Sequence, residues 1–179
     1  LYRIRYTGEP SAATPKTLVP NAELRALRHS LEKLHVRGEG GSDAVETAWS
    51  HLSHADRNIR YAARIAIECQ DVALWRERLF AEKNPRIVIY ASIALCRHGE
   101  KSLSGRLLDK LGEVAFEALE KEDQLALLRA HALCFVRMGQ PTGETAAAVI
   151  SRLDPHYPSK DDTVNAELCR VLASLDAPT

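Results

Sequence analysis

The 179-residue chain lacks an excess of either charge, because 24 Lys and Arg side chains balance 24 Asp and Glu side chains. Proteins that attract nucleic acid or membrane surfaces electrostatically carry a basic surplus. The composition therefore argues against both classes of partner. A content of 45% hydrophobic and 27% charged residues is typical of one globular domain.

Long apolar runs are also missing. The sequence contains no run of 18 apolar residues and no basic segment followed by an apolar one, so it predicts neither a membrane span nor a leader of its own. Met138 is the only methionine, and the chain begins at Leu1. We therefore expect this chain to be a piece of a longer protein.

Cysteine is scarce, and its spacing matches no metal or haem motif. Cys69, Cys96, Cys134 and Cys169 form neither a Cys-x-x-Cys pair nor a Cys-x-x-Cys-His motif. A glycine-rich phosphate loop after a strand is absent as well. We predict no cofactor, and we expect the four thiols to be buried as small hydrophobic side chains.

The sequence does contain a repeated helical pattern. In its first window an aspartate, Asp56, precedes apolar residues at positions 59, 63, 66 and 67. The same frame begins again at Asn84, Asp123 and Asp161, in steps of 28, 39 and 38 residues. Repeats of about this length are typical of stacked helix pairs. We therefore predict an all-α fold, a solenoid of about four helix pairs.

Each pair is predicted to contain a first helix and a second helix that begins at the repeated polar residue. The dipeptide Asn84-Pro85 favours such a start, because Asn caps helices and Pro fits the first helical position. The predicted first helices cover residues 43–52, 72–83, 103–119 and 145–153, and the second helices cover residues 56–67, 84–98, 123–138 and 161–175.

Residues 1–20 are predicted to be separate from the helical domain 21–179. The segment LYRIRY alternates apolar and basic residues with the period of a strand, and we interpret it as the last strand of a preceding β domain. Gly8 to Pro20 contains three prolines and is typical of a linker. A helix that begins near Asn21 is expected to cap the solenoid.

The predicted helix Pro85–His98 is apolar around nearly its whole circumference, so we expect every side of it to be covered. One alternative is that tight curvature or the N-terminal segment covers the side that a second helix normally exposes. The other is that a further domain docks there. The residues predicted to form this candidate interaction face are Tyr61, Ile65, Ile89, Ile93, Arg60 and Arg64.

Two residue pairs could carry chemistry. His51 and His54 have a spacing that suits two metal ligands, but no third ligand is nearby in the sequence, so we expect a solvated turn. His131 lies three residues before Cys134, although a nucleophile and its base also need a third, orienting group. We interpret this second pair as core packing.

The window from Asp56 to Arg64, DRNIRYAAR, resembles the second helix of a HEAT repeat. More widely, LYRIRYTGE, LRALRHSLEKLH and AWSHLSHADRNIRYAARIAIE resemble large exported bacterial proteins. In these proteins a β-propeller similar to sorbosone or glucose dehydrogenase precedes HEAT repeats and often a c-type haem module. The resemblance implies a periplasmic or otherwise exported setting, and it transfers no catalytic or haem-binding residue to this chain.

We predict a non-catalytic HEAT-like scaffold that binds protein, either the neighbouring propeller domain or an external partner, with no membrane insertion. One alternative is a nucleic-acid-binding domain similar to HEAT-like DNA glycosylases. It is suggested by Arg57, Arg60 and Arg64 along one helix, with Arg86, Arg97, Arg129 and Arg170 in the later ones. The zero net charge and interleaved carboxylates such as Glu68 argue against it, since phosphate binding draws on several uncompensated cations. An inert spacer is the third possibility.

Overall fold

The computed structural model describes residues 7–8, 21–98 and 100–177, and every regular element within those ranges is a helix. The predicted all-α class is therefore confirmed. The predicted strand 1–6 and nearly all of the linker lie outside the described residues. None of the described helices is long and apolar enough to cross a membrane.

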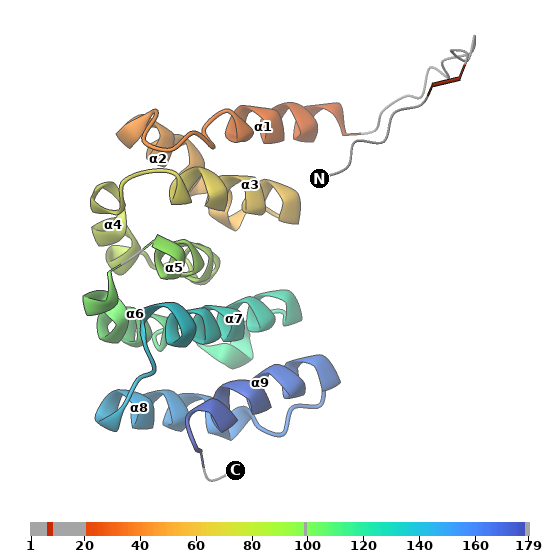
Figure 1. Cartoon of the computed structure of the whole chain (residues 1–179). Helices are drawn as coiled ribbons and strands as arrows, with labels where there is room; N and C mark the ends of the chain where they lie inside the picture. The colour runs from red at the N-terminus through yellow and green to blue at the C-terminus, as the bar shows by residue number, and fades with distance from the viewer. Residues whose placement is uncertain (1–6, 9–20, 99, 178–179) are drawn as a thin grey trace.

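The helices form two layers (Figure 1). One side of the molecule carries the first helices, and the other side carries the second helices, which we call the B layer. Successive B-layer helices contact each other, and α1 (Ala22–Glu32) packs on the first of them. The first helices are α2 (Gly41–Trp49), α4 (Arg76–Ala81), α6 (Ser104–Leu111) and α8 (Gly143–Leu153); the B layer contains α3 (Arg57–Glu68), α5 (Pro85–His98), α7 (Lys121–Met138) and α9 (Asp162–Ser174).

Three B-layer helices begin at the predicted capping residue. The side chains of Asp56, Asn84 and Asp161 accept hydrogen bonds from the backbone N–H groups two and three residues later, at distances of 2.7 to 3.4 Å. These bonds satisfy N–H groups that have no partner within the helix. The predicted starts of α3, α5 and α9 are confirmed.

The predicted cap of α7 is wrong. Helix α7 begins at Lys121, so Asp123 lies within its first turn. The Asp123 carboxylate accepts hydrogen bonds from Nε and Nη2 of Arg86 on α5, at 2.8 and 2.6 Å. The repeated aspartate here pairs with a neighbouring helix, and it does not cap its own.

The first helices are shorter than predicted in the middle of the chain. A 3-10 turn at Val72–Leu74 precedes the short α4, and α6 ends at Leu111 where a helix to residue 119 was predicted. Gly112, a poor helix former, begins the turn that follows α6. The guanidinium of Arg152 from α8 packs so close to Gly112 that an added Cβ would lie 1.9 Å from its Nη1. A side chain at this position would require the Arg152 guanidinium to move.

The core runs continuously between the two layers, and α5 lies in its middle. Helix α5 contacts α3 and α7 within the B layer and α4 and α6 in the other layer. Residues 87–89 and 91–96 are all buried, as expected for a helix that is apolar around nearly its whole circumference, and Tyr90 is half-buried. Trp49 and Trp75 are buried beneath the first helices, and Trp49 Nε1 donates to Glu82 at 2.9 Å.

The four cysteines are free thiols in different environments. Cys96 on α5 and Cys134 on α7 are buried, as expected. Cys69 is half-buried and Cys169 is exposed, so the expectation of four buried thiols is wrong for these two.

Candidate protein-binding groove

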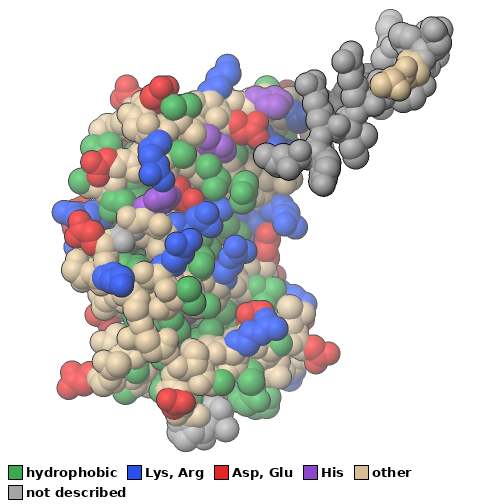
Figure 2. Space-filling model, in the orientation of Figure 1, with side chains coloured by type: hydrophobic (Ala, Val, Ile, Leu, Met, Phe, Trp, Pro, Cys, Tyr) green, Lys and Arg blue, Asp and Glu red, His purple; other side chains and the backbone are tan. Residues whose placement is uncertain are grey.

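A groove of about 520 Å³ lies on the B layer between α3 and α7, above α5. Figure 2 shows Lys and Arg side chains gathered over this part of the surface, with apolar side chains between them. Helices α3 and α7 supply the two walls, and α5 supplies the floor with Tyr90 and Ile93. The remaining lining residues are Arg57, Asn58, Tyr61 and Arg64 of α3 and Glu122, Leu125, Ala126 and Arg129 of α7.

Arg60 ties the groove walls together from beneath. Its side chain is fully buried, and Nη1 donates to the backbone carbonyls of His54 and Ala55, each at 2.8 Å. Nη2 donates to Glu122 of α7 at 2.5 Å, and the guanidinium lies 5.3 Å from the ring centre of Tyr90. Arg60 therefore holds the start of α3, the floor and the α7 wall in one arrangement.

Arg64 is the second buried cation of this region. It pairs with Glu68 one turn later and lies 5.0 Å from the ring centre of Tyr61. Glu68 also accepts a 3.0 Å contact from Nε of Arg97 on α5. Burial, with the positive charges of Arg97 and Arg129 added to it, lowers the pKa of Arg64 to about 10. Arg64 therefore remains charged near pH 7, since its pKa lies well above 7.

The other two arginines of the groove are exposed. Arg57 stands on the α3 wall and Arg129 on the α7 wall. Neither makes a hydrogen bond or an ion pair with any part of the chain that the structure describes. Both guanidinium groups are therefore available to a ligand.

The predicted interaction face is only partly accessible. Tyr61 is 59% exposed and Ile65 is half-buried, whereas Ile93 and Arg64 retain 5% and 7% exposure at the groove surface. Ile89 and Arg60 are fully buried by the neighbouring helices, so they cannot contact a partner. The prediction that Ile89 and Arg60 lie on the interaction surface is therefore corrected, because both side chains belong to the core beneath the groove.

The α7 wall was not predicted from the sequence. Its residues recur at intervals of three and four, which places them on one side of the helix. The spacing can be read from the sequence, but it does not determine which side of α7 faces α3 across α5. The lining residues missed by the sequence analysis are Asn58 of α3, Tyr90 of α5 and Glu122, Leu125 and Ala126 of α7, whereas Arg129 was predicted only within the nucleic-acid alternative.

The histidine pair His51 and His54 has no metal-binding geometry. The two ring centres are 6.2 Å apart with planes tilted by 58°, and Nδ1 of His54 accepts the backbone N–H of Asp56 at 3.0 Å. Among the described residues no group of three His, Cys, Asp or Glu side chains could hold a metal ion.

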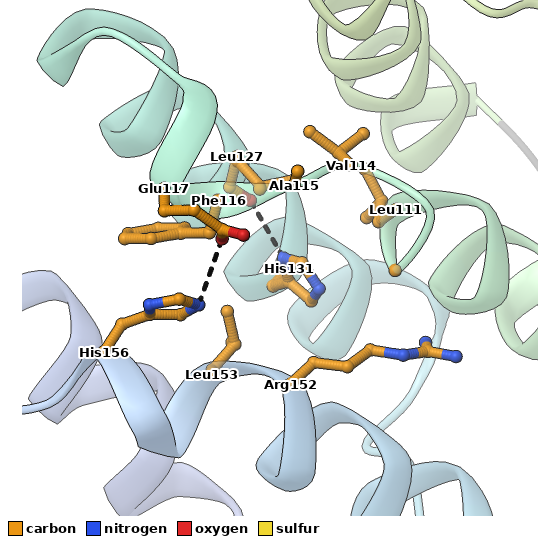
Figure 3. A pocket seen from close by; sticks show the side chains of 11 residues that line it. Leu111, Val114, Ala115, Phe116, Glu117, Leu127, His131, Arg152, Leu153 and His156 are labelled. Carbon is orange, nitrogen blue, oxygen red and sulfur yellow. Dashed lines mark hydrogen bonds and ion pairs between the residues drawn. The ribbon is translucent and has the colours of Figure 1, made fainter.

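His131 lines a smaller cavity of about 160 Å³ between α6, α7 and α8 (Figure 3). Its Nδ1 lies 3.0 Å from the carbonyl oxygen of Leu127, so this nitrogen carries the hydrogen and Nε2 is the acceptor. Burial lowers the pKa of His131 to about 4, and the ring is neutral near pH 7. The Cys134 thiol instead contacts Ser104 at 3.5 Å and Met138 at 3.9 Å. The two side chains therefore do not form a nucleophile and base.

Comparison of the chain with known protein families, with curated proteins and with solved structures finds no match. The likeness to HEAT repeats and to exported dehydrogenase-like proteins therefore stays a prediction from the sequence.

Proposed function

We propose that this chain is a non-catalytic scaffold that binds a partner protein in the B-layer groove. The observation that carries the proposal is Tyr61, a large aromatic side chain that is 59% exposed on the groove wall. Aromatic and arginine side chains are enriched where proteins bind each other. Tyr61 stands between Arg57 and Arg64, which gives the groove both kinds of contact.

The arrangement of the helices supports a HEAT-like solenoid. Each B-layer helix packs mainly on the B-layer helices before and after it, and on the first helices beside it. Repeats that contact only their neighbours leave an extended surface that such proteins use for binding. In this proposal the first helices supply stability and the B layer supplies the binding surface.

The proposed partner is the dehydrogenase-like β-propeller that would precede this chain in an exported protein. The likeness of residues 1–68 to such proteins supports this choice. Any oxidoreductase chemistry would belong to the propeller, and the helical domain would hold the propeller in place. The proposal assigns no cofactor to this chain.

Titration calorimetry of this chain against the isolated propeller domain tests the proposal. We expect a Kd in the micromolar range or tighter. Tyr61→Asp should weaken binding at least tenfold, because it places a charge where the partner would cover an aromatic ring. Leu74→Asp is the matched control, since Leu74 is 46% exposed but lies just before α4 in the other layer. The control should bind like the unchanged chain.

Two results would contradict the proposal. Equal loss of binding in Tyr61→Asp and Leu74→Asp would mean either that the interface lies outside the groove or that both variants are misfolded. Circular dichroism distinguishes these two explanations. Absence of binding by the unchanged chain would leave a spacer as the better explanation.

A further inference from the structure

We infer that the B-layer groove binds an acidic peptide segment, with carboxylates of the ligand paired to Arg57 and Arg129. The inference rests on the proposed function, because it names the chemistry of the partner segment that enters the same groove. It goes further in predicting which side chains of the partner are recognised and how salt affects the complex.

The charge around the groove is strongly uneven for a neutral chain. Four arginines line the groove or lie beneath it, at positions 57, 60, 64 and 129, against one carboxylate, Glu122, which leaves a net charge of +3. The whole chain has a net charge of zero. The charges elsewhere must therefore sum to −3, so positive potential is concentrated at the groove.

Glu122, the carboxylate among the lining residues, is already paired, and so is Glu68 at the end of α3. Glu122 accepts from Arg60, and Glu68 is shared by Arg64 and Arg97. The remaining cations, Arg57 and Arg129, stand on opposite walls, and each presents the planar guanidinium that pairs with a carboxylate through two hydrogen bonds. A ligand that crosses α5 from wall to wall meets one arginine on each side.

The floor between the two arginines is not polar. Ile93 and Tyr90 of α5, with Leu125 and Ala126 of α7, offer apolar surface between the two walls. A peptide has apolar side chains to place there and acidic ones to place on the walls. This combination of contacts fits a protein segment better than a free anion.

Nucleic acid is the less suitable anionic ligand. A duplex carries one negative charge per ~1.7 Å, and proteins that bind it commonly contact ~6–10 phosphates with Lys and Arg. This groove offers two unpaired arginines, and its ~520 Å³ volume suits a few side chains. The alternative nevertheless supplies a control for the test.

The test uses fluorescence anisotropy with a labelled glutamate-rich peptide that also contains leucine. Its counterpart carries glutamine in place of every glutamate. We expect the acidic peptide to bind the unchanged chain at ~50 mM salt, and to bind at least tenfold more weakly at ~500 mM salt, where charges are screened within about 4 to 5 Å. The glutamine peptide should bind at least tenfold more weakly than the acidic one.

A charge-matched pair of variants locates the site. The double variant Arg57→Gln/Arg129→Gln should bind the acidic peptide about tenfold more weakly, as expected for the loss of two exposed ion pairs. The control Lys33→Gln/Lys160→Gln removes the same charge from exposed positions outside the groove. It should bind like the unchanged chain.

Three results would overturn the inference. Equal binding of the glutamate and glutamine peptides would show a groove that ignores charge, which leaves the protein-binding proposal intact. Equal weakening by the two double variants would show attraction by net charge alone. An oligothymidylate that binds more tightly than the acidic peptide, and is lost in Arg57→Gln/Arg129→Gln, would identify the ligand as nucleic acid and would contradict both proposals.

Discussion

At the scale of single residues, two arginines one turn apart on α3 have opposite roles. Arg60 is fully buried, donates three hydrogen bonds to two carbonyl oxygens and Glu122, and lies over the ring of Tyr90. Arg57 is exposed on the groove wall. Their sequence context is similar, and the contacts of Arg60 with the chain before α3, with α5 and with α7 separate a structural cation from one that a ligand can reach.

Arg60→Met is therefore expected to destabilise the fold by about 2–3 kcal/mol, because two buried carbonyls and a carboxylate lose a charged donor. Arg57→Met should change the unfolding free energy by less than about 0.5 kcal/mol, as exposed substitutions usually do. Urea unfolding followed by circular dichroism measures both. Similar values for the two variants would contradict the assigned roles.

His131 makes stability depend on pH in a defined window. Its pKa is lowered from 6.5 to about 4 by burial, so between these values the unfolded chain binds a proton that the folded chain does not. Stability then falls as the pH drops from 6.5 to 4, and this residue accounts for about 3 kcal/mol of the loss. Above pH 6.5 the ring is neutral in both states, and it contributes no pH dependence.

The check compares urea unfolding of the unchanged chain and His131→Asn at pH 7 and at pH 4.5. The variant should lose less stability over this interval, although it starts from a lower value because the packing of His131 is disturbed. His29→Asn, at an exposed position of α1, serves as the control. An identical pH dependence in all three proteins would show that His131 titrates normally.

At the scale of elements, helix starts were predicted better than helix ends. The start of α5 depends on neighbouring residues, since the Asn84 cap bonds to N–H groups two and three residues away. The end of α6 depends on a distant part of the chain. Val114 and Ala115 continue the apolar pattern of the sequence, yet the chain turns at Gly112, where Arg152 from α8 packs against it.

The cap of α5 offers a test at this scale. Asn84→Ala should lower the unfolding free energy by about 1 kcal/mol, because two backbone N–H groups lose their acceptor. Asn84→Asp keeps an acceptor oxygen at the same place, so it should retain nearly full stability. Thermal unfolding of the three proteins gives the comparison, and equal destabilisation by Ala and Asp would show that the acceptor oxygen is not what stabilises the start of α5.

At the scale of the whole molecule, the contacts follow the order of the chain. Helix α9 packs on α7 and α8, and the earlier B-layer helices pack on one another. If the chain is a solenoid, its stability is close to a sum of repeat and neighbour contributions. Removing the last pair should then weaken the array without destroying it.

A chain that ends at Gly139 lacks α8 and α9 and tests this property. We expect an unchanged helical signal per residue and a lower unfolding midpoint. The unfolding free energy should also depend less steeply on denaturant concentration, because less surface is exposed on unfolding. The full chain is the reference. Loss of all helical signal would show one indivisible core, and it would contradict the solenoid.

The sequence by itself determined the all-α class, three of the four capping residues and the burial of α5. These features depend on periodicity and on bonds that span two or three residues, which a linear pattern records. Only the tertiary structure decided that Asp123 pairs with Arg86, that Arg60 and Ile89 are core residues, and that Arg57 and Arg129 share a groove. Those outcomes depend on the rotation of α7 relative to α3 and α5, a relation between distant segments that no local spacing encodes.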